Sequence, residues 1–260
     1  KVWVSFFNEA TVSRIRRNFG QADIICGSNV FCHIEDVNSV FRGIEILLKP
    51  DGLVFFEDPY LLDIIKKYSF DQFYDEHVYY FSGLSVSRLA KMHGMRLVDM
   101  KHQDVHGGSM RYYLKKGKID RPLKRVEAFL SQEKKLKLDR LAGYLNFKKN
   151  VDKICSELKH ALQQIKEQGS SIVGYGATSK STTLLNYARI GPELIDYICD
   201  TTPTKINKYS PGMHIPIKSH AIFRADNPAY ALLLAWNHRQ EIFAKENKYR
   251  GKGGKFITFF

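Results

Sequence analysis

The hydrophobic residues of this chain follow two alternating patterns, which predict strands separated by amphipathic helices. Apolar runs that predict strands lie at 2–7, 22–30, 53–58, 95–104, 109–117, 170–175, 194–200, 229–236 and 256–260. Segments with apolar residues every three or four positions, which predict helices, lie at 8–20, 36–49, 59–69, 85–93, 120–168, from about 178 and from 237. This alternation is typical of an α/β fold with a largely parallel sheet. We expect the run at 22–30 to be buried, and the runs at 95–104 and 109–117 to form an antiparallel pair at the sheet edge.

The same pattern divides the chain into three segments. Residues 1–116 hold one series of strands and helices, 117–168 are charged and helical with an apolar stripe, and 169–260 hold a second series. Because a helix with an apolar stripe buries that stripe, we expect the middle segment to be a connector that packs across both domains. The last segment runs from a strand through a glycine turn into a helix, which is a mononucleotide-binding pattern.

The 260 residues carry a formal net charge of +13. The excess lysines lie mostly in 115–167, at helical spacing, and in the glycine-rich tail 248–255. No zinc finger, RNA-recognition signature or aromatic–basic stripe accompanies them, so we expect a solvated helix face and no nucleic-acid partner. A basic cleft for a small anionic substrate, such as a nucleotide diphosphate, is the alternative.

No apolar run reaches the ~20 residues of a membrane helix, and no signal peptide opens the chain, so we expect a cytoplasmic protein with no membrane partner. The chain begins at Lys1 directly on a strand-like segment, and we interpret it as cut from something longer. The cysteines, Cys26, Cys32, Cys155 and Cys199, lack the spacing of a zinc site or a disulfide framework. We expect buried thiols.

The turn Gly174-Tyr175-Gly176 would let backbone amides and a helix start meet a phosphate. Ser179 stands where the dinucleotide fingerprint has its third glycine, and a tight turn without a ligand is the alternative. Lys180 in the first helical turn is disfavoured by the helix dipole unless an anion lies beside it. Asp200 ends the following strand, where a ribose-binding acid is expected.

Two further segments combine glycines, acids and histidines. HGGSMR at 106–111 predicts a hairpin turn, which could also bring backbone and Arg111 to a phosphate or a sugar hydroxyl. YDEHVYY at 74–80 gathers an acid, an imidazole and phenols, a set suited to general base chemistry, although packed aromatics on a surface loop give the same pattern. His33 follows a strand at the carboxyl edge of the sheet, where ligands bind in open α/β folds.

Two longer strings carry a resemblance. ADIICGSNVFCHIEDV with GIEILLKPDGLVFFEDPYLLDII resembles the fourth and fifth strands of a class I S-adenosylmethionine methyltransferase. The succession PYLLDII, FDQFYDEHVYYFS, HGGSMRYY, YGATSKSTTLLNY, DTTPTKINKYSPGMHIPI and LLLAWN is similar to the deoxysugar C-methyltransferases, which methylate carbon 3 of nucleotide-linked 4-keto sugars. The resemblance implies part of a class I methyltransferase Rossmann-like domain, followed by a second Rossmann-like domain that helps to hold the nucleotide sugar.

The resemblance also implies roles for residues of this chain. His77 matches the family's base, with Tyr74, Glu76 and His33 beside it, and Gly27, Ser28 and Asn29 are candidates for the cofactor pocket. Substrate-binding positions are implied at His106, Gly107, Gly108, Ser109, Arg111, Gly174, Gly176, Lys180, Asn186, Asp200, Lys208, Tyr209 and His214. Ser181-Thr182 and Ile206-Asn207 depart from the family's Gly-Asn and Gln-Gly, which leaves the preference for a nucleotide base open.

The implied reaction uses S-adenosylmethionine and a nucleotide diphosphate sugar. His77 would remove the hydrogen on carbon 3, and the resulting enolate would attack the methyl group. We expect a monomer, zinc only in a part that precedes Lys1, no metal in this chain, and no methylation by residues 1–260 alone. Two other functions fit the patterns: a nicotinamide oxidoreductase that uses the 174–180 turn and Asp200, and a non-catalytic nucleotide-sugar-binding protein.

Overall fold

A computed structural model describes residues 2–117 and 122–259. Its contacts divide the chain into two compact units, one of Lys1–Ile64 with Asp75–Tyr144 and the other of Ile65–Tyr74 with Leu145–Phe260. The division differs from the three predicted segments, because residues 65–74 belong to the second unit. Residues 118–121 of the predicted connector lie outside the described residues.

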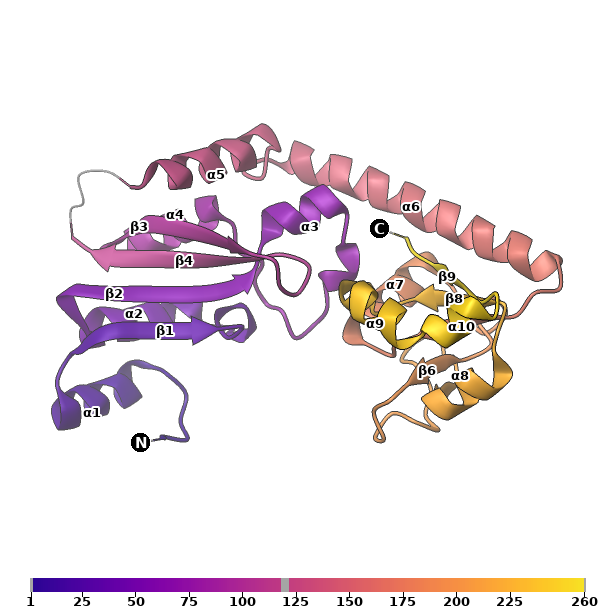
Figure 1. Ribbon diagram of the computed structural model, residues 1–260. Coiled ribbons are helices and arrows are strands. Elements are labelled where there is room, and N and C mark those ends of the chain that lie inside the picture. Colours follow the sequence, from indigo (N-terminus) through magenta and orange to yellow (C-terminus); the bar gives the residue numbers. More distant parts are fainter. Residues whose placement is uncertain (1, 118–121, 260) are drawn as a thin grey trace. The chain divides into compact units, whose positions relative to one another are not determined.

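The first unit is built on a four-stranded mixed sheet with the order β1-β2-β4-β3. Its strands are β1 (Ala22–Ser28), β2 (Leu48–Pro59), β3 (Met95–Gln103) and β4 (Ser109–Lys116). β1 and β2 are parallel, whereas β4 runs antiparallel to both β2 and β3, as Figure 1 shows. The predicted antiparallel pair at the sheet edge is therefore confirmed, with β3 outermost.

Side-chain caps fix where the helices of the first unit begin. Asn8, Asp36 and Ser82 each accept a hydrogen bond from a backbone amide of the first turn, as N-caps do. Apart from α6, which begins at Leu141, the helices that start within this unit are α1 (Glu9–Phe19), α2 (Val37–Leu47), α3 (Leu61–Lys67), α4 (Gly83–Met92), α5 (Lys124–Lys135) and the short 3₁₀ turn η1 (Phe31–His33). Most ends of the helices predicted in this half therefore agree with the structure to within one or two residues.

Two predictions for the amino-terminal part of the chain are wrong. Residues 2–7 form no strand, and Val2, Val4 and Phe6 are about nine-tenths or more exposed. Alternating apolar residues become a strand only when a neighbour satisfies their backbone groups, and within the described residues this segment has none. The run at 22–30 was expected to be buried, but β1 lies at the sheet edge and is largely exposed. Cys26 within it is exposed as well, whereas the other three thiols are buried.

The second unit holds a five-stranded sheet with the order β7-β6-β5-β8-β9, in which all pairs are parallel. Its strands are β5 (Ile172–Tyr175), β6 (Ile198–Asp200), β7 (Ile217–Ser219), β8 (Tyr230–Leu233) and β9 (Lys255–Ile257). Its helices are α6 (Leu141–Glu167), which begins in the first unit, α7 (Ser179–Ala188), α8 (His220–Asp226), α9 (Arg239–Lys245), α10 (Asn247–Gly251) and the 3₁₀ turns η2 (Phe70–Gln72) and η3 (Trp236–His238).

Alternate residues of these strands enter two separate cores. Ile172 and Ile198 pack with residues of α6 and α7, while Val173 and Cys199 pack with residues of α8 and α9. A parallel sheet that is covered on both faces is the doubly wound arrangement. The sequence missed β7 and α8, which have three and seven residues, because such short elements show little period.

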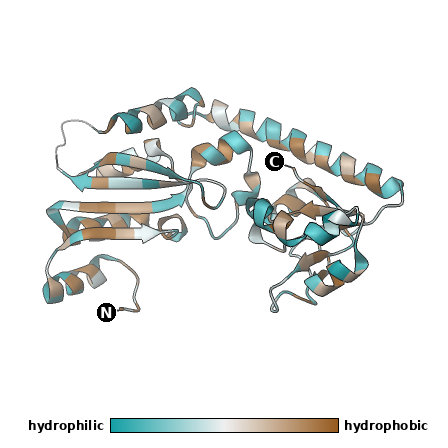
Figure 2. Cartoon of the chain, viewed as in Figure 1, coloured by the Kyte–Doolittle hydropathy of each residue, from teal (hydrophilic) through white to brown (hydrophobic). Residues whose placement is uncertain are grey.

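Helix α6 shows the predicted apolar stripe. In Figure 2 hydrophobic and hydrophilic residues alternate along its length. Val151, Cys155, Leu158 and Leu162 are buried in the core of the second unit, which accounts for the stripe in that part of the helix. Packing of the connector across both domains stays a prediction. Among the described residues, no helix is both long and apolar enough to cross a membrane.

Candidate functional site

The carboxyl ends of β1 and β2 form one edge of the first unit's sheet. β1 ends at Ser28, and the exposed Asn29 follows with a φ of 51°. Its N–H donates to the carbonyl of Glu57 in β2, at 2.7 Å. Gly27 is required by close packing, because an added Cβ would lie 2.8 Å from the ring of Phe31. The three predicted cofactor residues therefore lie together at this edge.

His33 and His77 meet just beyond that edge. The amides of Val78 and Tyr79 both donate to the carbonyl of Cys32, at 2.8 and 3.1 Å, which holds the 75–81 segment on η1. His33 Nδ1 donates to the carbonyl of Glu76 at 2.7 Å, since a carbonyl can only accept. The two imidazole centroids are 4.8 Å apart, with the ring planes at 65°. The structure thus brings together two histidines that are far apart in sequence.

The two predicted partners of His77, Glu76 and Tyr74, have different surroundings from the two histidines. The side chain of Glu76 is exposed, and the contact shown for this residue is made by its backbone carbonyl with His33. Tyr74 belongs to the second compact unit, whereas His77 belongs to the first. Tyr80 lies closer to the imidazole, with its ring centroid 5.6 Å from that of His77. Sequence analysis did not single out this phenol.

The turn between β3 and β4 has an unusual backbone. His106, Gly107 and Gly108 all have positive φ, and a Cβ added to Gly108 would lie 1.8 Å from Asp63 Oδ2. That oxygen is also 2.7 Å from His102 Nε2. Only glycine lets the turn approach this carboxylate so closely.

Arg111 and Ser109 both contact other residues of the first unit. The guanidinium of Arg111 donates twice to Glu57 Oε2, from Nη2 at 2.7 Å and from Nε at 3.0 Å. Its charge is therefore already balanced by a protein carboxylate. Ser109 is fully buried, and its hydroxyl lies 3.4 Å from the carbonyl of Val105.

A buried acid and a buried thiol lie beneath the histidines. Asp58 in β2 and Cys32 in η1 are both 0% exposed, and neither carboxylate oxygen of Asp58 forms a hydrogen bond of good geometry. Burial raises the pKa of Asp58 to about 6, an effect that the nearby Cys32 and His33 offset only in part. Burial and the neighbouring carboxylate raise the pKa of Cys32, so its thiol stays protonated.

Three of these side chains are spaced to hold a metal ion. One ligand atom each from Cys32, His33 and His77 lies within 4.8 Å of the others. Among the residues that the structure describes, this is the group of histidine, cysteine or acidic side chains whose ligand atoms lie close enough together to share a metal ion. The spacing of the cysteines along the sequence favoured buried thiols over a metal site, because it does not show which histidines lie beside Cys32.

In the second unit, packing accounts for the glycine turn. A Cβ on Gly174 would lie 2.8 Å from Leu234 and 2.9 Å from Ile198. Gly176 has a φ of 95°, and a Cβ there would lie 2.8 Å from Ala235. Both glycines are therefore required by close packing, whether or not a ligand binds at the turn.

The anion expected beside Lys180 is a carboxylate of the protein. Its Nζ lies 4.8 Å from the ring centroid of Trp236, whose indole N–H donates to Asp71 Oδ2 at 2.5 Å. Burial lowers the pKa of Lys180, and the charge of Asp71 opposes this shift. Asp71 is fully buried, and burial raises its pKa to about 6. The lysine that sequence analysis assigned to a phosphate is thus close to Asp71.

Asp200 closes the loop at the ends of β5 and β6. Its Oδ2 accepts the amide of Ala177 at 2.7 Å, and its Oδ1 accepts the amide of Thr202 at 2.7 Å. Although burial raises the pKa of Asp200, the hydrogen bonds from Thr202 and Ala177 leave it below the usual value. The acid holds the turn in shape.

A cavity of about 330 Å³ opens at the amino end of α7. Its polar lining comes from two segments of the chain and includes Thr178, Ser179, Thr204, Lys205, Lys208 and Tyr209. Lys208 and Tyr209 were predicted, whereas Lys205 was missed. The Nζ of Lys205 donates to the carbonyl of Ala177 at 2.7 Å. Two ammonium groups beside a helix amino end suit an anionic ligand.

Asn186 and His214 shape the neighbouring 208–216 turn. Asn186 Nδ2 donates to the carbonyl of Pro211 at 3.0 Å, and a Cβ on Gly212 would lie 1.8 Å from Asn186 Oδ1. His214 has a φ of 54°, and its amide donates to the carbonyl of Ser210. Both residues support the turn that presents Lys208 and Tyr209.

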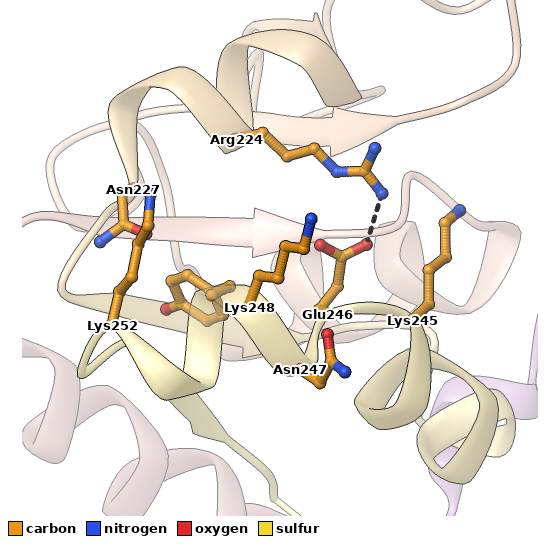
Figure 3. A pocket seen from close by; sticks show the side chains of 8 residues that line it. Arg224, Asn227, Lys245, Glu246, Asn247, Lys248 and Lys252 are labelled. Carbon is orange, nitrogen blue, oxygen red and sulfur yellow. Dashed lines mark hydrogen bonds and ion pairs between the residues drawn. The ribbon is translucent and has the colours of Figure 1, made fainter.

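A second cavity of about 350 Å³ lies between α8 and the α9–α10 pair. Figure 3 shows four cationic side chains along it, those of Arg224, Lys245, Lys248 and Lys252. Glu246 is 3% exposed and accepts from Arg224 at 3.3 Å and from Tyr175 at 3.1 Å. This cavity collects part of the chain's positive charge, and none of the predicted site residues lines it.

Comparisons with known proteins cover almost the whole chain. A family model described as "C-methyltransferase C-terminal domain" matches residues 104–260, and one described as "Methyltransferase domain" matches residues 5–99. The curated protein "C-methyltransferase NovU" of Streptomyces niveus is 34% identical over 253 residues, which are 97% of this chain and 60% of that protein. The chain therefore spans about three fifths of the length of this relative.

Proposed function

The chain belongs to the C-methyltransferase family, and on that basis we propose that it transfers a methyl group from S-adenosylmethionine to a carbon atom of its substrate. The family also confirms the predicted fold class, a partial class I methyltransferase domain followed by a second Rossmann-like domain. The central observation is the His33–His77 pair, which lies beyond the carboxyl edge of the first sheet, where ligands bind in open α/β folds.

The proposed substrate is a nucleotide-linked 4-keto deoxysugar that is methylated at carbon 3. Support comes from the motif succession in the sequence and from the cavity at the amino end of α7. Lys205 and Lys208 line that cavity, and their charges suit a diphosphate. Thr178 and Ser179, at the start of the helix, add hydroxyl groups and backbone amides.

The proposed cofactor contacts lie at the end of β1. Ser28 and Asn29 are exposed there, and the ring of Phe31 occupies the space that a side chain at Gly27 would need. These residues suit a ligand laid across the strand end, because Ser28 and Asn29 are accessible there. S-adenosylmethionine supplies an electrophilic methyl group on a sulfonium sulfur.

His77 acts as the general base in this proposal. A 4-keto group acidifies the hydrogen on carbon 3, so His77 takes that proton while the electron pair moves onto the keto oxygen as an enolate. His33 donates its Nδ1 hydrogen to a backbone carbonyl, so its ring is held in one orientation beside the base. A hydrogen-bond donor beside His77 is proposed to stabilise the enolate oxygen. The carbon would then take the methyl group as the ketone re-forms and the carbon–sulfur bond of the sulfonium breaks, which leaves a thioether.

The test is methyl transfer by the protein in its full natural length. With labelled S-adenosylmethionine and a nucleotide 4-keto sugar, His77→Asn is expected to lower turnover at least about a hundredfold, the lower end for loss of a general base. His160→Asn, an exposed histidine on α6, is the matched control and is expected to keep wild-type turnover. Equal turnover of the two variants would disprove the role of His77, and no label transfer by any form would disprove the reaction.

A further inference from the structure

The cluster beneath the proposed active site has a property that base catalysis does not use. Cys32, His33 and His77 each place a metal-ligating atom within 4.8 Å of the others. A thiol with two imidazoles is a ligand set typical of zinc. The three side chains come from η1 and the 75–81 segment, which the hydrogen bonds to the Cys32 carbonyl hold together.

The hydrogen bond of His33 prepares that ring for a metal ion. Its Nδ1 carries the proton and donates to the carbonyl of Glu76 at 2.7 Å. In the neutral imidazole with this tautomer, the lone pair lies on the other nitrogen, Nε2. Imidazoles that bind metals commonly have this arrangement, in which a backbone carbonyl fixes the tautomer and the ring orientation.

Asp58 supplies an independent observation. Its carboxylate is 0% exposed, beside Cys32, and neither oxygen has a hydrogen bond of good geometry. A buried carboxylate whose hydrogen bonds are this weak is costly. A divalent cation held by the adjacent side chains would provide the countercharge that this carboxylate lacks.

We propose that Cys32, His33 and His77 form a binding site for a thiophilic divalent cation of the Zn²⁺ type, with water in the fourth position. Tetrahedral zinc places sulfur and nitrogen ligands about 3.3–3.6 Å from one another. The observed spacing, up to 4.8 Å, exceeds this by about 1 Å, which small shifts of the three side chains would close. On binding, the Cys32 thiol releases its proton to solvent and its sulfur forms the bond to the metal ion.

A consequence follows if His77 is also the base. The metal ion occupies the lone pair that would accept the substrate proton, so the cation inhibits methyl transfer. This consequence rests on the proposed function, whereas metal binding itself does not. Spectroscopy on the resting protein separates the two.

The direct test is titration of the 260-residue chain with Co²⁺, followed by absorption. A bound thiolate is expected to give a sulfur-to-cobalt charge-transfer band, together with the visible bands of a tetrahedral site, and Zn²⁺ is expected to remove both by competition. Cys32→Ser is expected to abolish the charge-transfer band. Cys26→Ser is the matched control, because Cys26 is an exposed cysteine of the neighbouring strand and is expected to leave the band unchanged.

The opposite pattern, in which the band survives Cys32→Ser or is lost with Cys26→Ser, would overturn the site, as would the absence of any band. Circular dichroism checks that each variant is folded. Should Cys32→Ser fail to fold, His33→Gln at the exposed position gives the second test, with an expected loss of Co²⁺ affinity of at least about tenfold. Unchanged affinity in that variant would also contradict the site.

The inhibition arm uses the full-length protein. Zn²⁺ is expected to lower methyl transfer reversibly, with recovery on adding a chelator, and His33→Gln is expected to raise the inhibitory concentration at least about tenfold. Charge-transfer absorption without inhibition would support the metal site. It would contradict the assignment of His77 as the base. Inhibition without the absorption band would contradict the metal site.

Discussion

Two fully buried aspartates, Asp58 and Asp71, lie next to the residues assigned to chemistry. Asp58 lies beside Cys32 in the first unit, and Asp71 lies beside Trp236 and Lys180 in the second. Burial raises the pKa of each to about 6, so each favours its neutral form more than an exposed aspartate does. At both positions the protein keeps a polar group where an apolar one would cost less free energy, which is a common feature of functional sites.

For Asp71 the shift predicts a pH dependence of stability. The folded protein binds this proton up to about pH 6, whereas the unfolded chain releases it near the ordinary aspartate pKa of 3.8. The stabilisation is therefore complete below about pH 4 and is lost as the pH rises through about 6. A shift of this size corresponds to about 3 kcal/mol.

Asp71→Asn is expected to reduce the loss of unfolding free energy between pH 4 and pH 7 by about 2 kcal/mol, because a small part is already lost at pH 4. The measurement is urea unfolding at the two pH values, followed by Trp236 fluorescence in a Trp3→Phe background. Glu157→Gln, an exposed position on α6, is the control and should keep the wild-type dependence. A pH dependence of Asp71→Asn identical to that of wild type would show that this carboxyl does not titrate with a raised pKa.

Gly108 offers a test of close packing in the β3–β4 turn. Gly108→Ala and Gly94→Ala both place a side chain at positive φ, but only at position 108 would the new methyl group meet Asp63. His102 holds that carboxylate, so it cannot easily move aside. Gly108→Ala is expected to be the more destabilising of the two. Its unfolding free energy, measured by urea unfolding, should be lower than that of Gly94→Ala by more than about 1 kcal/mol. Equal losses in both variants would refute the contact.

At the scale of the elements, a carboxylate of α5 holds the start of α4. Glu133 is fully buried and accepts the amides of Gly83 and Leu84, at 2.7 and 2.8 Å, together with the hydroxyl of Tyr60 at 2.8 Å. Burial raises the pKa of Glu133, and these donors oppose that rise. A residue distant in sequence thus satisfies the first amides of a helix that Ser82 also caps.

Glu133→Ala is expected to leave three buried donors without an acceptor, at a cost of about 3 kcal/mol or more. If α4 opens locally, its amides should exchange about a hundredfold faster, which hydrogen-exchange mass spectrometry of the 82–92 segment can measure. Glu127→Ala, at an exposed position in the first turn of α5, is the control and should change exchange little. Unchanged protection in Glu133→Ala would show that α5 does not stabilise α4.

The sequence predicted elements that carry their own end signals. Asn8, Asp36 and Thr178 cap the helices that follow them, and each was recognisable as a polar residue before an apolar period. The strand predicted at residues 2–7 was wrong, because strand formation depends on a neighbouring strand and not on alternation of apolar residues alone. β7 was missed because three residues show no period.

For the whole molecule, the site was predictable only in part. His33 and His77 were each identified by motif and resemblance, but their contact depends on backbone hydrogen bonds to the Cys32 carbonyl. The approach of Asp58 to Cys32 depends on the pairing of β1 with β2, in which Ser28 lies opposite Glu57. Such a pairing is a tertiary property, and the sequence gives no local signal for it.

The same holds for the second unit. Lys208 and Tyr209 were predicted from resemblance, and the cavity at the start of α7 adds Lys205, which comes from a loop without a motif of its own. Lys180 carried the clearest electrostatic argument in the sequence, yet its neighbouring anion is Asp71, which precedes it by more than a hundred residues. Charge arguments from sequence identify the need for an anion and not its source.

The central claim is that His77 removes a proton from the carbon next to a ketone, and isotope exchange tests it most directly. A nucleotide 4-keto sugar is incubated in D₂O with the full-length protein and without methyl donor, and deuterium at carbon 3 is followed by NMR. Wild type is expected to exchange this hydrogen, and His77→Asn to exchange it at least about a hundredfold more slowly. Exchange by His77→Asn at the wild-type rate would contradict the account.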